Sequence, residues 1–157
     1  MKAKMIFAGV LATGFFFGAA NSAAQSLNPT HWIKKSPTAT EQLAANQEEN
    51  RKLALQLQAI LPQRTTLNDA CLAFKSLDDC VAALHVSHNL KIRFTCLKWQ
   101  VTAVQSSGTA TACKAPERGR PVNLVKAIRL LKPDADAKTE ARTAEKRAHE
   151  DIKDASS

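Results

Sequence analysis

Four cysteines constrain the fold of this 157-residue chain more than any other sequence feature. Cys71, Cys80, Cys96 and Cys113 are an even number, which suits two disulfides, and four cysteines allow three pairings. We favour Cys71–Cys80 with Cys96–Cys113, because each bond then closes a local loop between neighbouring elements. A crosslink around about 15 residues contributes roughly 3 kcal/mol in the chain-entropy model, a sizeable share of the stability of a small domain.

The N-terminus has the features of an export signal, which would place these cysteines in an oxidising compartment. Two lysines precede an uncharged, largely apolar run over residues 5–18, and a Ser-Ala-Ala tripeptide ending at Ala24 supplies the small residues that a signal peptidase recognises. We predict a signal peptide over residues 1–24. The alternative, an uncleaved membrane anchor, is disfavoured because the run is shorter than the roughly 20 apolar residues that span a bilayer. We therefore expect the mature protein to be exported, to the periplasm or the medium.

The rest of the chain is expected to form one small all-α domain with an extension at each end. Residues 25–37 contain two prolines and lack periodicity, which predicts an extended arm, with Trp32 and Ile33 as the side chains that dock it on the body. Residues 38–133 carry the cysteines and the apolar helical spacings, so they should form the disulfide-stapled helical domain. Residues 134–157 are rich in Ala, Lys, Arg and Glu, and their thin apolar stripe predicts a charged helical tail that stands off the body or frays.

The first predicted helix covers residues 40–61, begins at a cap on Thr38 or Thr40 and stops before Pro62. Its first half is almost wholly polar and is expected to project into solvent. A loose heptad runs along this helix and makes it a candidate for a weak homodimer contact, although two of the seam positions are polar. The seam positions are Leu43, Gln47, Asn50, Ala54, Leu57 and Leu61.

Two further helices are predicted around the first pair of cysteines. The earlier one starts at Thr65 or Thr66 and runs towards Phe74. The later one starts at Ser76, whose hydroxyl accepts a backbone N–H, and it ends at a left-handed Asn89. One face of the later helix should be buried, including part of His88, and it consists of Leu77, Cys80, Val81, Leu84 and His88.

The second half of the domain is harder to interpret. Residues 90–104 alternate as in a strand and also show helical spacing, and we favour a helix from about residue 95, capped by Thr95. Residues 105–121 are rich in turn residues and predict a loop. Asn123 then caps a short helix that ends before Pro133.

His85 and His88 are the best metal-binding candidates, because three residues along a helix place them about 60° apart on its surface. A transition-metal site needs three or four ligands, and no further ligand is expected to converge on this pair, so we favour structural histidines. Asp78 and Asp79 are adjacent first-turn acids that point about 100° apart, which suits the helix dipole better than acid–base catalysis.

The chain has no G-x-S-x-G, no H-E-x-x-H and no glycine-rich phosphate loop. We therefore predict a protein that is not an enzyme and needs no cofactor. The alternative is a metal-dependent or hydrolytic protein that uses His85 and His88.

The positive charge is concentrated in residues 95–132, which hold seven bases against Glu117 as the single acid. The formal net charge is +8, or +6 once the two leader lysines are removed. In an exported protein such a surface suits an anionic envelope polymer or lipid headgroups rather than a specific nucleic acid. The alternative is a solvated surface that the acidic tail partly neutralises. The candidate anion-binding residues are Lys98, Lys114, Arg118, Arg120, Lys126, Arg129 and Lys132.

The segments CLAFKSLDDCVAALHVSHNL and VNLVKAIRLLKPDADAK, within residues 66–140, resemble a recurring pattern in small uncharacterised exported bacterial proteins. The resemblance implies a disulfide-linked helical core around Cys71 and Cys80. It implies no activity, cofactor or catalytic residue, and Cys96 and Cys113 lie outside the two segments.

Overall fold

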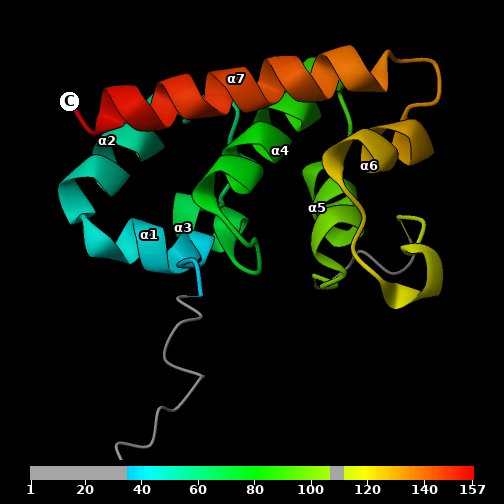
Figure 1. The fold of residues 1–157 in the computed structure, drawn as a ribbon, viewed down its shortest axis with the longest axis horizontal. Coiled ribbons are helices and arrows are strands. Elements are labelled where there is room, and N and C mark those ends of the chain that lie inside the picture. The colour runs from blue at the N-terminus through cyan, green and yellow to red at the C-terminus, as the bar shows by residue number, and fades with distance from the viewer. Residues whose placement is uncertain (1–34, 107–111) are drawn as a thin grey trace, which may run out of the picture. The chain divides into compact units, whose positions relative to one another are not determined.

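The described part of the chain is built from helices, most of which begin at a side-chain cap. The computed structural model describes residues 35–106 and 112–157, and all regular secondary structure within them is helical (Figure 1). The predicted all-α fold is therefore confirmed. The predicted signal peptide over residues 1–24 lies outside the described residues, as does the arm up to Lys34 with Trp32 and Ile33.

Two helices, α1 (Ala39–Ala45) and α2 (Gln47–Gln56), stand where the sequence predicts one continuous helix over residues 40–61. The helix breaks at Asn46, which has an extended backbone with φ −140° and ψ 102°. Its side-chain oxygen accepts two N–H groups of the following turn, at 3.1 and 3.3 Å, so it caps α2 instead of continuing α1. The prediction of a continuous helix is wrong because asparagine competes for backbone groups in this way.

The first half of that segment is packed into the fold. α1 begins with a capping box between Thr38 and Glu41 and packs on α4 (Leu77–Leu90). Leu43 is 2% exposed, and Leu57, in the turn after α2, is 1% exposed. The expectation that the first half projects into solvent is wrong, and the heptad that suggested a homodimer directs these two leucines into the core of the chain itself.

α3 (Leu67–Cys71) and α4 begin at the predicted caps. The Thr66 hydroxyl accepts the Asp69 N–H, and the Ser76 hydroxyl accepts the Asp79 N–H, both at 3.1 Å. Each bond satisfies one of the N–H groups that have no partner within the first turn of a helix. The local sequence therefore determines where these two helices start.

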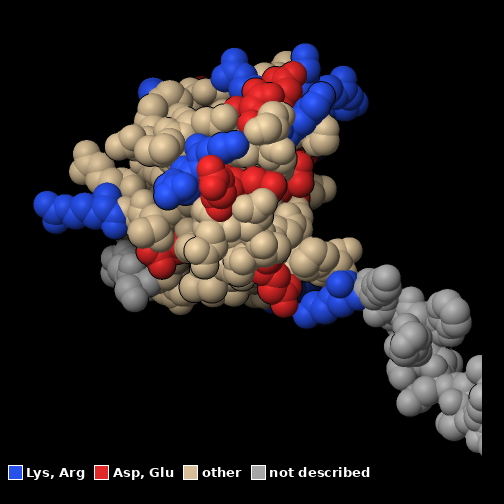
Figure 2. Space-filling model, turned by 90° about the vertical axis from the view of Figure 1, so that its left-hand side faces the viewer, with Lys and Arg blue, Asp and Glu red and all other residues tan. Residues whose placement is uncertain are grey.

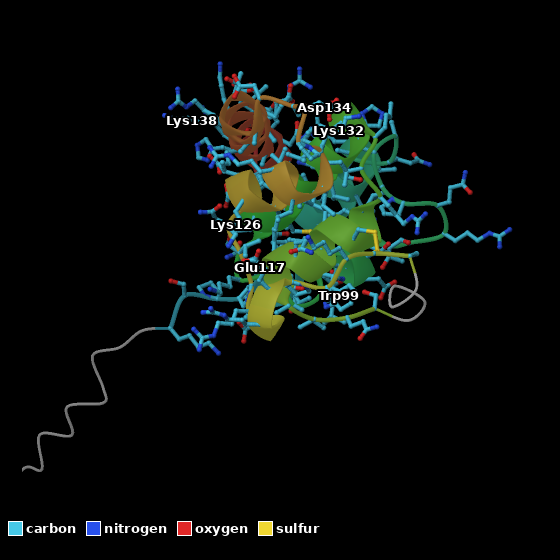
Figure 3. All side chains as sticks on the ribbon, turned by 90° about the vertical axis from the view of Figure 1, so that its right-hand side faces the viewer. Trp99, Glu117, Lys126, Lys132, Asp134 and Lys138 are labelled. Carbon is cyan, nitrogen blue, oxygen red and sulfur yellow. A yellow bond between two sulfur atoms is a disulfide. The ribbon has the colours of Figure 1, made fainter. Side chains whose placement is uncertain are left out.

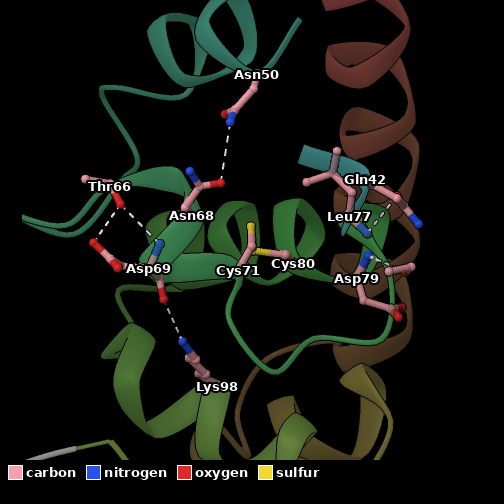
Figure 4. The surroundings of a disulfide bond; sticks show 11 residues. Gln42, Asn50, Thr66, Asn68, Asp69, Cys71, Leu77, Asp79, Cys80 and Lys98 are labelled. Atoms are coloured by element: carbon pink, nitrogen blue, oxygen red, sulfur yellow. Dashed lines mark hydrogen bonds between the residues drawn. A yellow bond between two sulfur atoms is a disulfide. The ribbon is translucent and has the colours of Figure 1, made fainter. Parts of the chain in front are cut away.

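Both predicted disulfides are present. Cys71 and Cys80 join the end of α3 to the first turn of α4 with a Cα–Cα distance of 5.2 Å (Figure 4). Cys96 and Cys113, also 5.2 Å apart between Cα atoms, join α5 (Phe94–Thr102) to the loop that follows it. The favoured pairing is therefore confirmed, and the described residues contain no free cysteine.

α4 is the central helix, because α1, α3, α5 and α7 (Ala137–Ala155) all pack against it. Five consecutive residues, 80–84, are buried, so the helix has no solvated face along this stretch. It ends at Lys91, whose backbone is left-handed with φ 55°. The prediction of a left-handed Asn89 is wrong by two residues, since Asn89 still lies within the helix.

α5 resolves the ambiguity of residues 90–104 in favour of a helix. Its N-cap is Arg93, which makes no side-chain cap, so the prediction that Thr95 caps it is wrong. α6 (Leu124–Leu131) begins as predicted at Asn123, whose side chain accepts the Lys126 N–H at 2.9 Å. α6 packs on both α5 and α7, which carries the second half of the domain onto the central helix.

α7 corrects the largest error of the sequence prediction. The tail does not stand off the body: it packs along α4 and also touches α6 and α2, and Figure 1 shows it running across the top of these helices. Its buried residues are all alanines, which bring helix axes close together because they have so little side chain. They are Ala137, Ala141, Ala144, Ala148 and Ala155.

The end of α7 is also fastened. Lys52 donates to the backbone oxygen of Ser157 at 3.2 Å, and Ser156 donates to the Glu49 carboxylate at 3.3 Å. No helix in the described part of the chain, α7 included, combines the length and the apolar content needed to cross a bilayer.

Candidate anion-binding surface

Lys98 does not belong to the predicted cationic patch. The residue is 7% exposed, and its Nζ donates a hydrogen bond of 2.9 Å to the backbone carbonyl of Asp69 in α3 (Figure 4). Burial lowers the pKa of this ammonium group, and the Asp69 charge acts in the opposite direction. Lys98 is therefore a structural contact that joins α5 to α3. The sequence of α5 alone does not indicate that this lysine faces the interior.

Most of the other predicted cations gather around the turn between α5 and α6. We use the term cationic surface for the five that are exposed. They are Lys114, Arg118, Arg120, Lys126 and Arg129. The first three come from the loop, and the last two come from the outer side of α6.

The loop makes a tight reversal at the 3-10 helix η2 (Glu117–Gly119). Arg118 and Gly119 both have positive φ, 55° and 62°. Gly119 donates its N–H to the Pro116 carbonyl at 3.1 Å, and Arg120 donates to the Glu117 carbonyl at 3.2 Å. A glycine is suited to the second left-handed position because it has no Cβ to clash. The reversal therefore displays two arginines, one on each side of that glycine.

Both ends of this turn are attached to α5 through Gln100, a fully buried residue. The Gln100 side-chain amide donates to the Lys114 carbonyl at 2.7 Å. The Val122 N–H donates to the Gln100 backbone carbonyl at 2.9 Å. The Cys96–Cys113 disulfide adds a covalent link just before the turn. The two arginines are therefore carried by a segment that two hydrogen bonds and a disulfide attach to α5.

The charges of the surface are only partly compensated. Lys126 pairs with Glu117 at 3.0 Å, and Lys132 lies 3.7 Å from Asp134 (Figure 3). The hydrogen bond and the positive charge of Lys126 lower the pKa of the exposed Glu117 carboxyl. Within the described parts of the chain, no carboxylate forms an ion pair with either arginine of the turn. The two arginines of the turn are therefore exposed cations without an ion-pair partner among the described residues.

The acidic tail does not neutralise this surface as a whole. Among the described residues, Lys132–Asp134 is the ion pair that joins residues 95–132 to the tail. Within α7, charges also pair with each other, as in Lys146–Glu150 at 3.7 Å. On the opposite face of the molecule, Figure 2 shows basic and acidic side chains intermingled. The cationic surface differs from that face because it holds five exposed cations against Glu117, and neither arginine of the turn forms an ion pair among the described residues.

Sequence reasoning missed two neighbouring cations, Lys91 and Arg93, which lie just before residues 95–132. Together with Lys132 they border an open hollow, and both are exposed. They come from the junction of α4 and α5, whereas Lys132 follows α6, so only the tertiary fold brings them together. No local pattern in the sequence indicates this proximity. The apolar floor of the hollow is formed by Leu90, Ile92 and Leu131.

The two histidines have the reverse of their predicted environments. His85 is part-buried, with its side chain 12% exposed, and its Nε2 lies 2.7 Å from the Asp151 carboxylate of α7. His88, which was expected to be part-buried, is exposed. Asp151 is 66 residues away in sequence, so the contact had no local signal. His85 thus links the central helix to α7.

Asp78 and Asp79 are exposed and lie in the first turn of α4, at its positive end. His149 of α7 lies 3.9 Å from Asp78, which is the long limit of an ion pair. Among the described residues, no three side chains of His, Cys, Asp or Glu are grouped in a way that would hold a metal ion.

Comparison with protein-family models, with curated proteins and with solved structures finds no match to this chain. The role of the cationic surface must therefore be argued from its own residues and geometry.

Proposed function

We propose that this chain is an exported, non-enzymatic protein that binds an anionic envelope component through the cationic surface. The observation that carries the proposal is the turn at η2, where Arg118 and Arg120 are exposed, lack an acidic partner among the described residues, and are attached to α5 at both ends. A guanidinium group binds phosphate or carboxylate through two parallel hydrogen bonds. An ordered turn loses little entropy on binding, which favours affinity.

The backbone of Arg118 is left-handed. A residue with a Cβ at φ 55° is less stable than glycine would be there, by about 1 kcal/mol. The same conformation occurs at Arg64, Ala73, Lys91 and Ala103, so strain alone does not single out this position. Arg64 and Lys91 are also exposed and form no ion pair among the described residues, so the proposal rests on the arrangement of the turn and not on this strain.

Export is supported by two independent features. The N-terminal sequence has the charge, apolar run and small residues of a leader, and the two disulfides suit an oxidising compartment. The anionic groups accessible to an exported protein include phospholipid headgroups, and these are the ligands to test first.

The test measures sedimentation of the purified protein with phosphatidylglycerol-containing vesicles and with pure phosphatidylcholine vesicles, over increasing salt. We expect binding to the anionic vesicles alone, weakening as salt rises. Because each cation near an anionic membrane contributes about 1 kcal/mol, the Arg118→Gln/Arg120→Gln variant should lose roughly thirtyfold in affinity.

The matched control is Arg142→Gln/Arg147→Gln, which removes the same charge from the exposed side of α7. It should weaken binding by no more than about threefold, through the net charge alone. Equal losses in the two variants, or no binding at low salt to either anionic vesicles or soluble polyphosphate, would reject the proposal. Binding to soluble polyphosphate without binding to vesicles would assign the surface to a polymer.

A further inference from the structure

A second feature, a cavity of about 310 Å³, lies among α4, α5, α7 and the segment that leads into α6. Its size is at the lower end of the range for small-molecule sites, roughly 300–1,000 Å³. Phe74 and Ala82 are buried residues of its wall, and Figure 1 shows α4, α5 and α6 below α7. The other apolar residues that line it are Val101, Pro121, Val122 and Leu124.

Among the charged side chains that line this cavity, acidic residues outnumber basic ones, which is the reverse of the chain as a whole. Asp79 of α4 and Glu145 of α7 contribute two carboxylates, against the single ammonium group of Lys75. All three residues are exposed, and none of the described ion pairs uses them. The rim therefore has a local charge of −1 on a protein whose formal net charge is positive.

We propose that this cavity binds a small molecule with an apolar body and one protonated amine. The apolar body would lie against Phe74 and its neighbours, which removes apolar surface from water. The ammonium group would lie at the rim near Asp79 and Glu145, whose field favours a cation. Lys75 disfavours a second positive charge, so a monocation fits better than a diamine. This site is separate from the cationic surface in both charge and ligand class.

The test uses three probes with the same six-carbon chain: n-hexylamine, hexan-1-ol and hexanoate. Isothermal titration calorimetry of the purified chain should rank hexylamine as the tightest ligand, hexanol as intermediate and hexanoate as the weakest. We expect hexylamine to bind about three- to tenfold tighter than hexanol, since the rim charges are partly screened by solvent. High salt should reduce this preference and leave hexanol binding unchanged.

Variants separate the roles of charge and shape. Glu145→Gln should lower hexylamine affinity about threefold without affecting hexanol, whereas Glu150→Gln, on the same helix and outside the cavity, should change neither. Lys75→Gln should strengthen hexylamine binding about two- to threefold. Val122→Phe should fill the cavity and weaken both ligands.

Three results would overturn this inference: hexanoate binding as tightly as hexylamine, no binding of any probe, or equal effects of Glu145→Gln and Glu150→Gln. Glu145 is exposed in the middle of α7, so its variant does not depend on refolding of the core. Vesicle binding through Arg118 and Arg120 is measured separately, so absence of amine binding would not by itself reject the vesicle-binding proposal.

Discussion

At the scale of single residues, Lys98 shows how a charged side chain can serve the fold. Its pKa is lowered by burial, so the unfolded chain binds more protons than the folded chain between the lowered pKa and the ordinary lysine value of roughly 10.4. Over that window the free energy of unfolding rises with pH. We expect the wild type to gain stability relative to Lys98→Met and Lys98→Arg as the pH is raised from about 7 to about 9.5.

Urea denaturation of the three proteins at both pH values measures this effect. Lys98→Arg is the control that keeps a donor for the Asp69 carbonyl and stays charged throughout. Lys98→Met leaves that carbonyl without its partner, which costs about 1–3 kcal/mol at every pH and so does not alter the trend. If all three proteins showed parallel pH dependences, Lys98 would not be the buried ammonium group described above.

Three predicted helix caps are confirmed, and in each the partner is close in sequence. The caps at Thr66, Ser76 and Asn123 each accept an N–H three residues ahead, so the local pattern contains the whole interaction. His85 was misjudged because its partner, Asp151, comes from another helix. The spacing of residues within one helix does not indicate which of two histidines will contact a carboxylate from another helix.

At the scale of elements, helix type was predictable and helix packing was not. The helical spacing of residues 94–102 and 124–131 identified α5 and α6. The apolar spacing of residues 40–61 predicted one continuous helix, but Asn46 caps α2 and divides it in two. α7 was expected to be loosely attached because alanine buries little area. The structure shows the other consequence of small side chains: α7 lies directly along α4, which is buried around its whole circumference over residues 80–84.

This close packing makes a specific prediction for α7. Ala144 is fully buried, so Ala144→Leu has no room for the added carbons and should lower the free energy of unfolding by about 1–3 kcal/mol. The matched control, Thr143→Leu, adds an apolar side chain at the adjacent exposed position and should change it by less than about 0.5 kcal/mol. Urea unfolding midpoints measure both. Equal stability of the two variants would mean that α7 does not pack on α4 in solution.

At the scale of the whole molecule, the sequence predicted the charge of the candidate site but not how its loop is attached. Lys126 and Arg129 fall three apart on α6, and their common exposure follows from helical geometry. The attachment of the turn to Gln100 was not visible, because it depends on how the loop returns to α5. Charge density thus located the surface, whereas its order and its unpaired arginines came from the tertiary fold.

The two disulfides should have separable roles in the molecule. In the chain-entropy model each contributes about 3 kcal/mol, but Cys71 and Cys80 are fully buried at the junction of α3 with the central helix. Cys71→Ala/Cys80→Ala also leaves a cavity there, so it should be the more destabilising pair. Cys96→Ala/Cys113→Ala releases the covalent link before the basic turn, so it should retain the helical content and weaken vesicle binding several-fold.

Circular dichroism, urea unfolding and vesicle sedimentation of the two double variants distinguish these effects. The two bonds differ in position, since Cys71–Cys80 lies in the core and Cys96–Cys113 holds the loop before the basic turn to α5. If Cys96→Ala/Cys113→Ala bound anionic vesicles as tightly as the wild type, the Gln100 hydrogen bonds alone would suffice to order the turn. Cys71 and Cys80 are more deeply buried than Cys96 and Cys113, so their loss should be the more destabilising. If Cys96→Ala/Cys113→Ala proved the less stable variant instead, the core around α4 would depend on the loop disulfide.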